Sequence, residues 1–196
     1  MKGYAYIDTE TTGFRSTDEV LQMAVVQLDA QGEIESTWST LVNPHLAFIP
    51  HYDIHKITPA EVAGAPSIDE ALDLLAPQIA GRTLAAHNYA FDQRMVNAAA
   101  ARAGHRLRLP DGICTVELAR QHLPGPFKLG VLCRRLGIDL SDAHNASADA
   151  LAGAHLLRYL LGLEPDRTLP VLDWLARLAE SAQAPNNRLS ASQTAA

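Results

Sequence analysis

The alternation of apolar and polar residues in the first third of the chain predicts three β-strands. Residues 4–8 (YAYID) are aromatic and β-branched, and residues 20–29 are largely apolar. A turn at Gln31 and Gly32 leads into a third extended segment over residues 35–42. Since these segments follow one another with short connections, they favour a β-meander.

Apolar residues at helical spacing predict helices in the remainder of the chain. Ile68, Leu72, Leu75 and Ile79 define one face of a helix over residues 68–79. A short strand over residues 82–87 comes next, and residues 43–66 contain four prolines and are expected to be irregular. Further helices are expected over residues 89–103, 115–123, 129–136 and 145–161. The chain thus begins with strands and continues with strands and helices in alternation. This order predicts an α/β fold with a mixed central sheet flanked by helices.

The character of the sequence changes after Gly162. Residues 169–178 carry an apolar stripe that predicts one more helix, which either packs on the preceding domain or binds a partner. Residues 182–196 are rich in Ala, Ser, Gln and Asn and are expected to form a flexible tail. We therefore expect one folded domain over residues 1–163, followed by a C-terminal helix and tail over residues 164–196.

Composition places the chain among globular proteins and limits how it could hold a polyanion. Of 196 residues, 47% are hydrophobic and 19% charged, and the formal net charge is −6. An acidic protein is expected to hold nucleic acid locally, at a site, rather than through a broadly basic surface. Cys114 and Cys133 lack the spacing of a disulfide framework or zinc site. With no run of about 20 apolar residues and an early charge at Asp8, we expect no membrane span, no signal peptide and a cytoplasmic location.

Four acidic residues occupy positions where charge is unexpected. Asp8 ends the first strand, and Glu10 lies two residues further on, so both can point to the same side. Asp92 and Asp149 each lie on an otherwise apolar helix face. Each acid alone also fits an ordinary turn or a first helical turn. Together, converging carboxylates would repel one another unless a hard divalent cation such as Mg²⁺ lay among them.

Three segments resemble the sequence motifs of the DEDD exonuclease superfamily. They are residues 7–13 (IDTETTG), 86–92 (AHNYAFD) and 144–150 (HNASADA), and the histidine five residues before Asp149 is typical of the histidine branch. Residues 54–58 (IHKIT) and 114–120 (CTVELAR) resemble linking segments of the same group. The similarity extends over residues 4–162, and the chain is most similar to epsilon-type proofreading exonucleases of bacterial DNA polymerase III and to related stand-alone nucleases.

The resemblance implies a ribonuclease H-like fold and an exonuclease domain over residues 1–163. It implies hydrolysis of phosphodiesters from the 3′ end to nucleoside 5′-monophosphates, with two Mg²⁺ or Mn²⁺ ions per site. His144 is the expected general base. The expected metal ligands are Asp8, Glu10, Asp92 and Asp149. Single-stranded or frayed DNA is the expected substrate, in proofreading or repair. The alternatives are an RNA-trimming exonuclease and a non-catalytic module that binds a polymerase.

The resemblance also implies contacts with the terminal nucleotide, and it shows two departures from the family pattern. The expected contacts are Thr11, Thr12, His55, Asn88 and Phe91. Asn88 could instead cap the helix that follows it, and Phe91 could belong to the core. Gln22 stands where many relatives carry a glutamate, and the stretch before His55 is shorter than usual. A DNA polymerase subunit is a further expected partner, through the C-terminal region.

Overall fold

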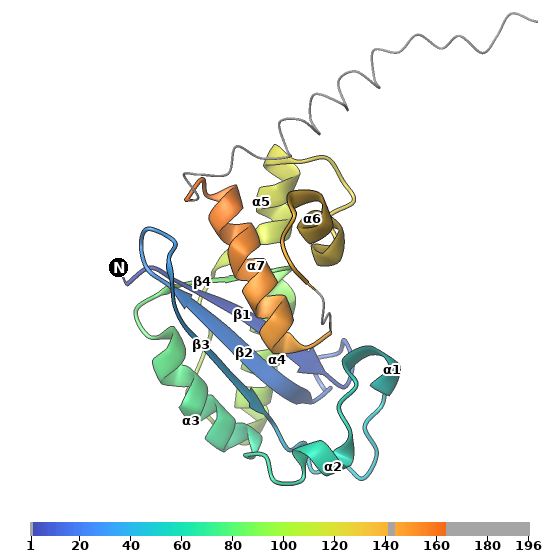
Figure 1. Ribbon diagram of the computed structural model, residues 1–196. Helices are drawn as coiled ribbons and strands as arrows, with labels where there is room; N and C mark the ends of the chain where they lie inside the picture. Colours follow the sequence, from blue (N-terminus) through green and yellow to red (C-terminus); the bar gives the residue numbers. More distant parts are fainter. Residues whose placement is uncertain (1, 141–143, 164–196) are drawn as a thin grey trace, which may run out of the picture.

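A mixed β-sheet forms the centre of the molecule. The computed structural model describes residues 2–140 and 144–163. Within them the sheet has five strands in the order β3-β2-β1-β4-β5 (Figure 1). β1 is antiparallel to β2, which is antiparallel to β3, whereas β4 runs parallel to both β1 and β5. The strands are β1 (Tyr4–Thr11), β2 (Val20–Leu28), β3 (Ile34–Leu41), β4 (Thr83–Ala86) and β5 (Ile113–Cys114).

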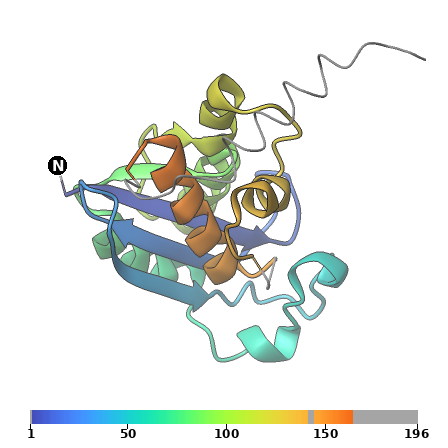
Figure 2. The same ribbon diagram turned by 45° about the horizontal axis from the view of Figure 1, so that its top comes forward.

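Helices cover both faces of this sheet (Figure 2). One face packs against α3 (Ile68–Ile79) and α4 (Tyr89–Ala103), and the opposite face packs against α7 (Ala146–Leu160). α5 (Thr115–His122) and α6 (Leu129–Leu136) lie beside α7 and share a third apolar cluster with it. The predicted α/β fold with a mixed sheet flanked by helices is therefore confirmed.

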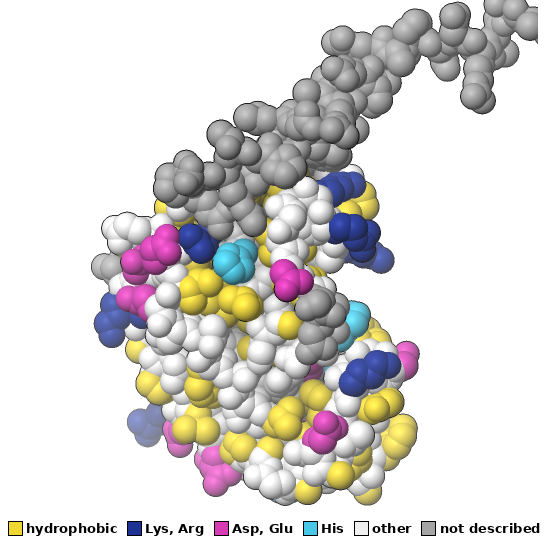
Figure 3. Space-filling model, viewed as in Figure 1, with side chains coloured by type: hydrophobic (Ala, Val, Ile, Leu, Met, Phe, Trp, Pro, Cys, Tyr) yellow, Lys and Arg dark blue, Asp and Glu magenta, His cyan; other side chains and the backbone are white. Residues whose placement is uncertain are grey.

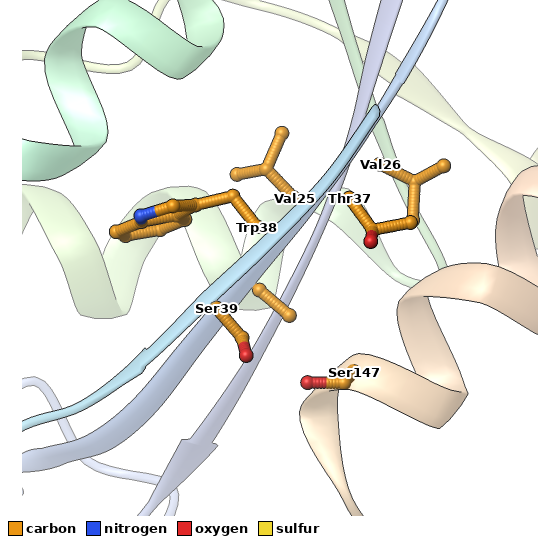
Figure 4. A pocket seen from close by; sticks show the side chains of 7 residues that line it. Val25, Val26, Thr37, Trp38, Ser39 and Ser147 are labelled. Carbon is orange, nitrogen blue, oxygen red and sulfur yellow. The ribbon is translucent and has the colours of Figure 1, made fainter. Parts of the chain in front are cut away.

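The two faces of β2 and β3 show why most residues of β2 are apolar. Val25 and Trp38 belong to the core under α3 and α4, whereas Val26 belongs to the core under α7. Figure 4 shows Val25 and Trp38 on one side of the sheet and Thr37 on the other. Ser147 of α7 also lines the small cavity of about 90 Å³ at this edge. Because β2 is covered on both faces, its apolar residues do not alternate with polar ones, and only Gln22 and Gln27 interrupt them.

The structure corrects three details of the predicted elements. β1 continues past the predicted end at Asp8 to Thr11. The region 43–66, expected to be irregular, contains the one-turn helices α1 (Tyr52–His55) and α2 (Pro59–Val62). A capping box between Thr58 and Glu61 starts α2. β5 was not predicted, because two residues are too few to show a strand period.

Two expectations fall outside the described residues. The helix over residues 169–178 and the tail over residues 182–196 both lie there, and the domain boundary after residue 163 stays a prediction. Among the residues that the structure describes, each helix is too short or too polar to span a lipid bilayer.

Candidate active site

The first strand delivers two acidic side chains to one side of the sheet. Side chains alternate along a strand, so Tyr6, Asp8 and Glu10 share the face that α7 covers. The parallel pairing of β1 with β4 ends at Tyr6 and Ala85. Beyond that point, Thr9, Glu10 and Thr11 of β1 line a cavity near the carboxyl ends of the strands. Open α/β sheets commonly bind ligands in such a crevice.

Helix α7 brings Asp149 over the same part of β1. Gly153 lies one turn after Asp149, and a Cβ atom at Gly153 would overlap with the ring of Tyr6. The absence of a side chain there lets α7 approach the strand closely. Gln22 of β2 fixes the start of α7, because its Oε1 accepts a hydrogen bond of 3.1 Å from the backbone N–H of Ala146. The glutamine that departs from the family pattern thus helps to position Asp149.

Three of the four predicted acids meet at this point. Among the described residues, one carboxylate oxygen from each of Asp8, Glu10 and Asp149 lies within 4.8 Å of the other two. Asp92 stands outside this group and approaches from α4. Its Oδ1 accepts a hydrogen bond of 2.8 Å from the hydroxyl of Thr9. Since Thr9 faces the opposite side of β1 from Asp8, Asp92 lies next to the strand and flanks the cluster.

Burial raises the pKa of three of these acids, and neighbouring carboxylates raise the pKa of Asp8 and Glu10 further. Burial is the largest cause at each of Asp8, Glu10 and Asp92. The charge of Asp92, then those of Asp149 and Glu10, raises the pKa of Asp8 further above its usual range. The pKa of Glu10 rises to about 7 through burial and the charges of Asp149 and Asp92. The pKa of Asp92 also rises to about 7, against the opposing effect of the hydrogen bond from Thr9.

The donor set of this cluster fits a divalent cation. Hard cations such as Mg²⁺ and Mn²⁺ bind to the oxygen atoms of several carboxylates that lie close together. A cation among them would stabilise the ionised carboxylates, which burial and mutual repulsion otherwise disfavour. Asp8, Glu10 and Asp149 are the residues that would hold it, with Asp92 beside them.

These raised pKa values predict that the metal-free protein loses stability as pH rises from 5 to 8. The unfolded chain releases these protons near pH 4, whereas the folded chain keeps them up to about pH 7. In that interval the unfolded chain binds fewer protons, so the free energy of unfolding falls with pH. We expect the Tm in EDTA to fall by on the order of 5–10 °C, for a loss of a few kcal/mol.

Thermal unfolding followed by fluorescence in EDTA and in MgCl₂ tests this prediction. Mg²⁺ should raise the Tm more at pH 8 than at pH 5, because the ionised carboxylates bind it. Asp8→Asn should show a weaker pH dependence than the wild type in EDTA. A Tm in EDTA that stays constant or rises between pH 5 and pH 8 would contradict the repulsion among the acids.

His144 lies at the start of the segment that carries Asp149. It is exposed and has a left-handed backbone conformation with φ of 69°. Its backbone N–H donates a hydrogen bond of 2.9 Å to Oδ2 of Asp149. Asp149 therefore fixes the backbone of His144 while the imidazole stays on the surface, beside the carboxylates.

A cavity of about 370 Å³ opens next to these groups. Of the expected contact residues, Thr11 and Phe91 line it, together with His144 and Glu10. Three further lining residues, Phe14, His51 and Ile54, were not among the expected contacts and come from loops and from α1.

Two phenylalanine rings form one wall of this cavity. Phe14, which is 71% exposed, lies 6.0 Å from Phe91 between ring centroids, with the rings tilted by 57°. Arg94 holds the pair, since its guanidinium lies 5.4 Å from the centre of the Phe91 ring and donates a hydrogen bond of 3.1 Å to the carbonyl of Phe14. An aromatic wall of this kind can contact a base of any identity.

The remaining expected contact residues have other partners in the structure. Both ring nitrogens of His55 are engaged within its own loop, with the carbonyl of Pro50 at 2.8 Å and the N–H of Ile57 at 3.0 Å. The side chain of His55 therefore stabilises the conformation of α1 and of the residues before it. Ile54 of α1 and the preceding His51 line the cavity. Thr12 is buried, and its hydroxyl accepts a hydrogen bond of 2.8 Å from the backbone N–H of Glu19. Both residues shape loops that border the cavity.

Asn88 occupies the N-cap position of α4, but it does not cap the helix with its side chain. Its backbone is left-handed, with φ of 72°, and the described structure has no hydrogen bond from its side chain to the first turn. The interpretation of Asn88 as a capping side chain is wrong, because a left-handed N-cap points its side chain away from the free N–H groups. The side chain is exposed and lines a second cavity.

Comparison with known proteins identifies relatives that carry exonuclease domains. Residues 6–157 match the model of the family described as Exonuclease, RNase_T. The chain is 36% identical over 161 residues to the DNA polymerase III PolC-type of Clostridium perfringens, covering 80% of this chain and 11% of the relative. It is 29% identical over 181 residues to the 3′-5′ exonuclease DinG of Staphylococcus saprophyticus, covering 89% of this chain and 19% of the relative. The chain thus spans about a tenth to a fifth of the length of these two relatives.

A solved structure covers nearly the same length as this chain. Exonuclease X in complex with 5′ overhanging duplex DNA superimposes with a TM-score of 0.66 at 27% identity. The match covers 84% of this chain and 94% of that one. Together with the family match, this confirms the ribonuclease H-like exonuclease fold that the motifs predicted.

Proposed function

The chain belongs to the exonuclease family RNase_T, and we propose that it hydrolyses nucleic acid from the 3′ end and releases nucleoside 5′-monophosphates. The observation that carries this proposal is the position of the acidic cluster. The mutually close oxygens of Asp8, Glu10 and Asp149 adjoin a cavity that Glu10 and His144 line. A cavity of about 370 Å³ is within the range of small-ligand sites and suits one terminal nucleotide.

In this proposal the cavity residues, the four acids and His144 have separate roles. The cavity holds the terminal nucleotide, and the rings of Phe14 and Phe91 contact its base. Two Mg²⁺ or Mn²⁺ ions, held by the four acids, would supply water activation and stabilisation of the leaving oxygen. His144 accepts the proton of the attacking water, because its imidazole is exposed at the edge of the cavity. Asp149 keeps the backbone of His144 in place during this step.

Single-stranded or frayed DNA ends are the proposed substrate, in proofreading or repair. The DNA polymerase III PolC-type relative supports DNA as the substrate, and the 3′-5′ exonuclease DinG supports attack from the 3′ end. The expectation that residues 164–196 contact a DNA polymerase subunit stays a prediction, because these residues lie outside the described structure. The cytoplasmic location also stays a prediction.

Degradation of end-labelled oligonucleotides tests the proposal. We expect mononucleotides to leave from the 3′ end with Mg²⁺ or Mn²⁺ and no products in EDTA. Single-stranded or frayed ends should react faster than matched duplex ends, and a 3′-phosphate should inhibit, because the terminal hydroxyl is expected to lie against Thr11. DNA and RNA of equal sequence, assayed side by side, decide between the DNA and RNA alternatives. Products released from the 5′ end, or cutting of a closed circle, would refute the proposal.

A further inference from the structure

A second, larger cavity lies on the other side of the first turn of α4. Its volume is about 510 Å³, and it is formed by the start of α4, by α5 and by the loop before α6. The chemically distinctive lining residues are His87, Asn88, Glu117, Arg120, Phe127 and Lys128. None of these residues has a catalytic role in the proposed function. Asn88 is the one for which the family resemblance implied a nucleotide contact.

The first turn of α4 separates the two cavities. Asn88 lines the second cavity and Phe91 lines the first, and the N–H of Phe91 donates a hydrogen bond of 2.8 Å to the carbonyl of Asn88. Asp92, the acid that flanks the cluster, follows Phe91 in this same turn. A polymer whose end occupies the first cavity and whose next linkage lies at the acids could therefore continue into the second cavity.

The second cavity combines positive charge with an aromatic ring. Arg120 and Lys128 are exposed, and the guanidinium of Arg120 lies 5.6 Å from the centre of the Phe127 ring. Figure 3 shows Lys and Arg side chains gathered over the α6 end of the molecule. Cationic side chains next to an aromatic ring and a free amide are typical of surfaces that follow a single nucleic-acid strand. Glu117 opposes this charge, because it lies one helical turn from Arg120.

Hydrogen bonds tie the wall of this cavity to the strand that carries Asp8. Nε2 of His87 contacts the carbonyl of Phe127 at 2.8 Å and must donate, since a carbonyl can only accept. Nδ1 of His87 contacts the hydroxyl of Thr115 at 3.0 Å, and that hydroxyl lies 3.3 Å from the hydroxyl of Tyr6. Tyr6 precedes Asp8 by two residues on the same face of β1. A series of hydrogen bonds therefore connects Phe127 to the strand that carries Asp8.

We propose that this second cavity binds the single strand upstream of the scissile linkage. Arg120 and Lys128 contact its backbone phosphates, and Asn88 and Phe127 contact the adjoining sugar or base. The proposal rests on the proposed function, since it assumes that the terminal nucleotide lies in the first cavity. It explains how a chain with a net charge of −6 holds a polyanion beyond its acidic cluster.

Two substrates that differ only upstream of the scissile bond test this inference. The p-nitrophenyl ester of thymidine 5′-monophosphate has no upstream strand, whereas a 12-nucleotide DNA has one. For Arg120→Ala/Lys128→Ala, we expect KM on the 12-mer to rise about tenfold, as for two lost phosphate contacts, and to depend less on salt. We expect kcat/KM on the ester to stay within about twofold of the wild type.

The controls change charge elsewhere or in the opposite direction. Lys2→Ala/Arg106→Ala removes one lysine and one arginine far from the cavity, before β1 and after α4, and should leave both substrates unaffected. Glu117→Gln removes the opposing charge and should lower KM on the 12-mer by about two- to fivefold. Equal effects of Arg120→Ala/Lys128→Ala on both substrates, or no effect on either, would overturn the inference.

A binding measurement separates the failure of this inference from the failure of the proposed function. Fluorescence anisotropy of a labelled 12-mer in EDTA reports strand binding without hydrolysis. If Arg120→Ala/Lys128→Ala weakens binding and Lys2→Ala/Arg106→Ala does not, the strand-binding cavity is supported even if no hydrolysis is found. If the wild type fails to bind, or all variants bind equally, the inference is wrong whatever the protein hydrolyses.

Discussion

Replacing Asp8 by asparagine is expected to lower the rate of 3′-end degradation by about 10⁴-fold or more. The side chain keeps its size and loses its charge, and Asp8 belongs to the group of three carboxylates with mutually close oxygens. Sites whose members act as a unit lose about 10⁴–10⁶-fold in kcat when one essential member is removed. Single-turnover degradation of a labelled oligonucleotide at saturating Mg²⁺ measures the loss.

The same variant should remain folded, which separates a catalytic defect from an unstable protein. Burial and then neighbouring charges raise the pKa of Asp8, so removing its charge relieves both a desolvation cost and a repulsion in the metal-free state. We expect the Tm of Asp8→Asn in EDTA at pH 8 to equal or exceed that of the wild type. Asp69→Asn, which removes an exposed acid from the first turn of α3, should keep full activity. Full activity of Asp8→Asn, in a preparation free of contaminating nuclease, would exclude the acidic cluster from the reaction.

Much of the fold could be predicted because its elements carry strong periodic signals. The helix over residues 68–79 was predicted with the bounds it has from four apolar residues on one face. The structure adds a capping box between Ser67 and Glu70 at its start. The one-turn helices α1 and α2 were missed, because four residues cannot show a helical period among prolines. β5 depends on its pairing with β4, a long-range contact that its two residues cannot indicate.

The site was predictable where a residue type conflicts with its surroundings. Asp8 and Asp149 stand out as charges on apolar elements, Glu10 follows Asp8 by two residues on the same side, and the structure gathers all three. Asp92 stood out in the same way, but its hydrogen bond with Thr9 depends on how α4 packs against β1, which no local pattern fixes.

Residues whose role depends on a loop conformation could not be identified from the sequence. Phe14, His51 and Ile54 reach the first cavity because loops turn them towards it. Arg120 and Lys128 face a common cavity with Asn88 only after three separate segments have packed, which no local pattern indicates. Family motifs point to single residues, whereas a cavity is a property of the packed chain.

The role of His144 can be separated from that of the acids by replacing it with asparagine. Its φ of 69° lies in the left-handed region, which asparagine adopts more readily than alanine, so the variant should keep the backbone hydrogen bond to Asp149. The four carboxylates are unchanged and should still bind Mg²⁺. A general base contributes about 10²–10⁴-fold to rate, so we expect turnover to fall by that factor while binding of the oligonucleotide persists.

The pH dependence of the rate then identifies the base. A protonated imidazole cannot accept a proton, so the wild-type rate should fall towards acid pH, and this decrease should be weakened or displaced in His144→Asn. Single-turnover rates at saturating Mg²⁺ are required, because Glu10 and Asp92, with pKa values raised to about 7 without metal, would otherwise titrate in the same range. His45→Asn, at another exposed histidine with positive φ, should match the wild type at every pH. Equal rates and superimposable profiles for His144→Asn and the wild type would remove His144 from the mechanism and leave the carboxylate cluster to act without it.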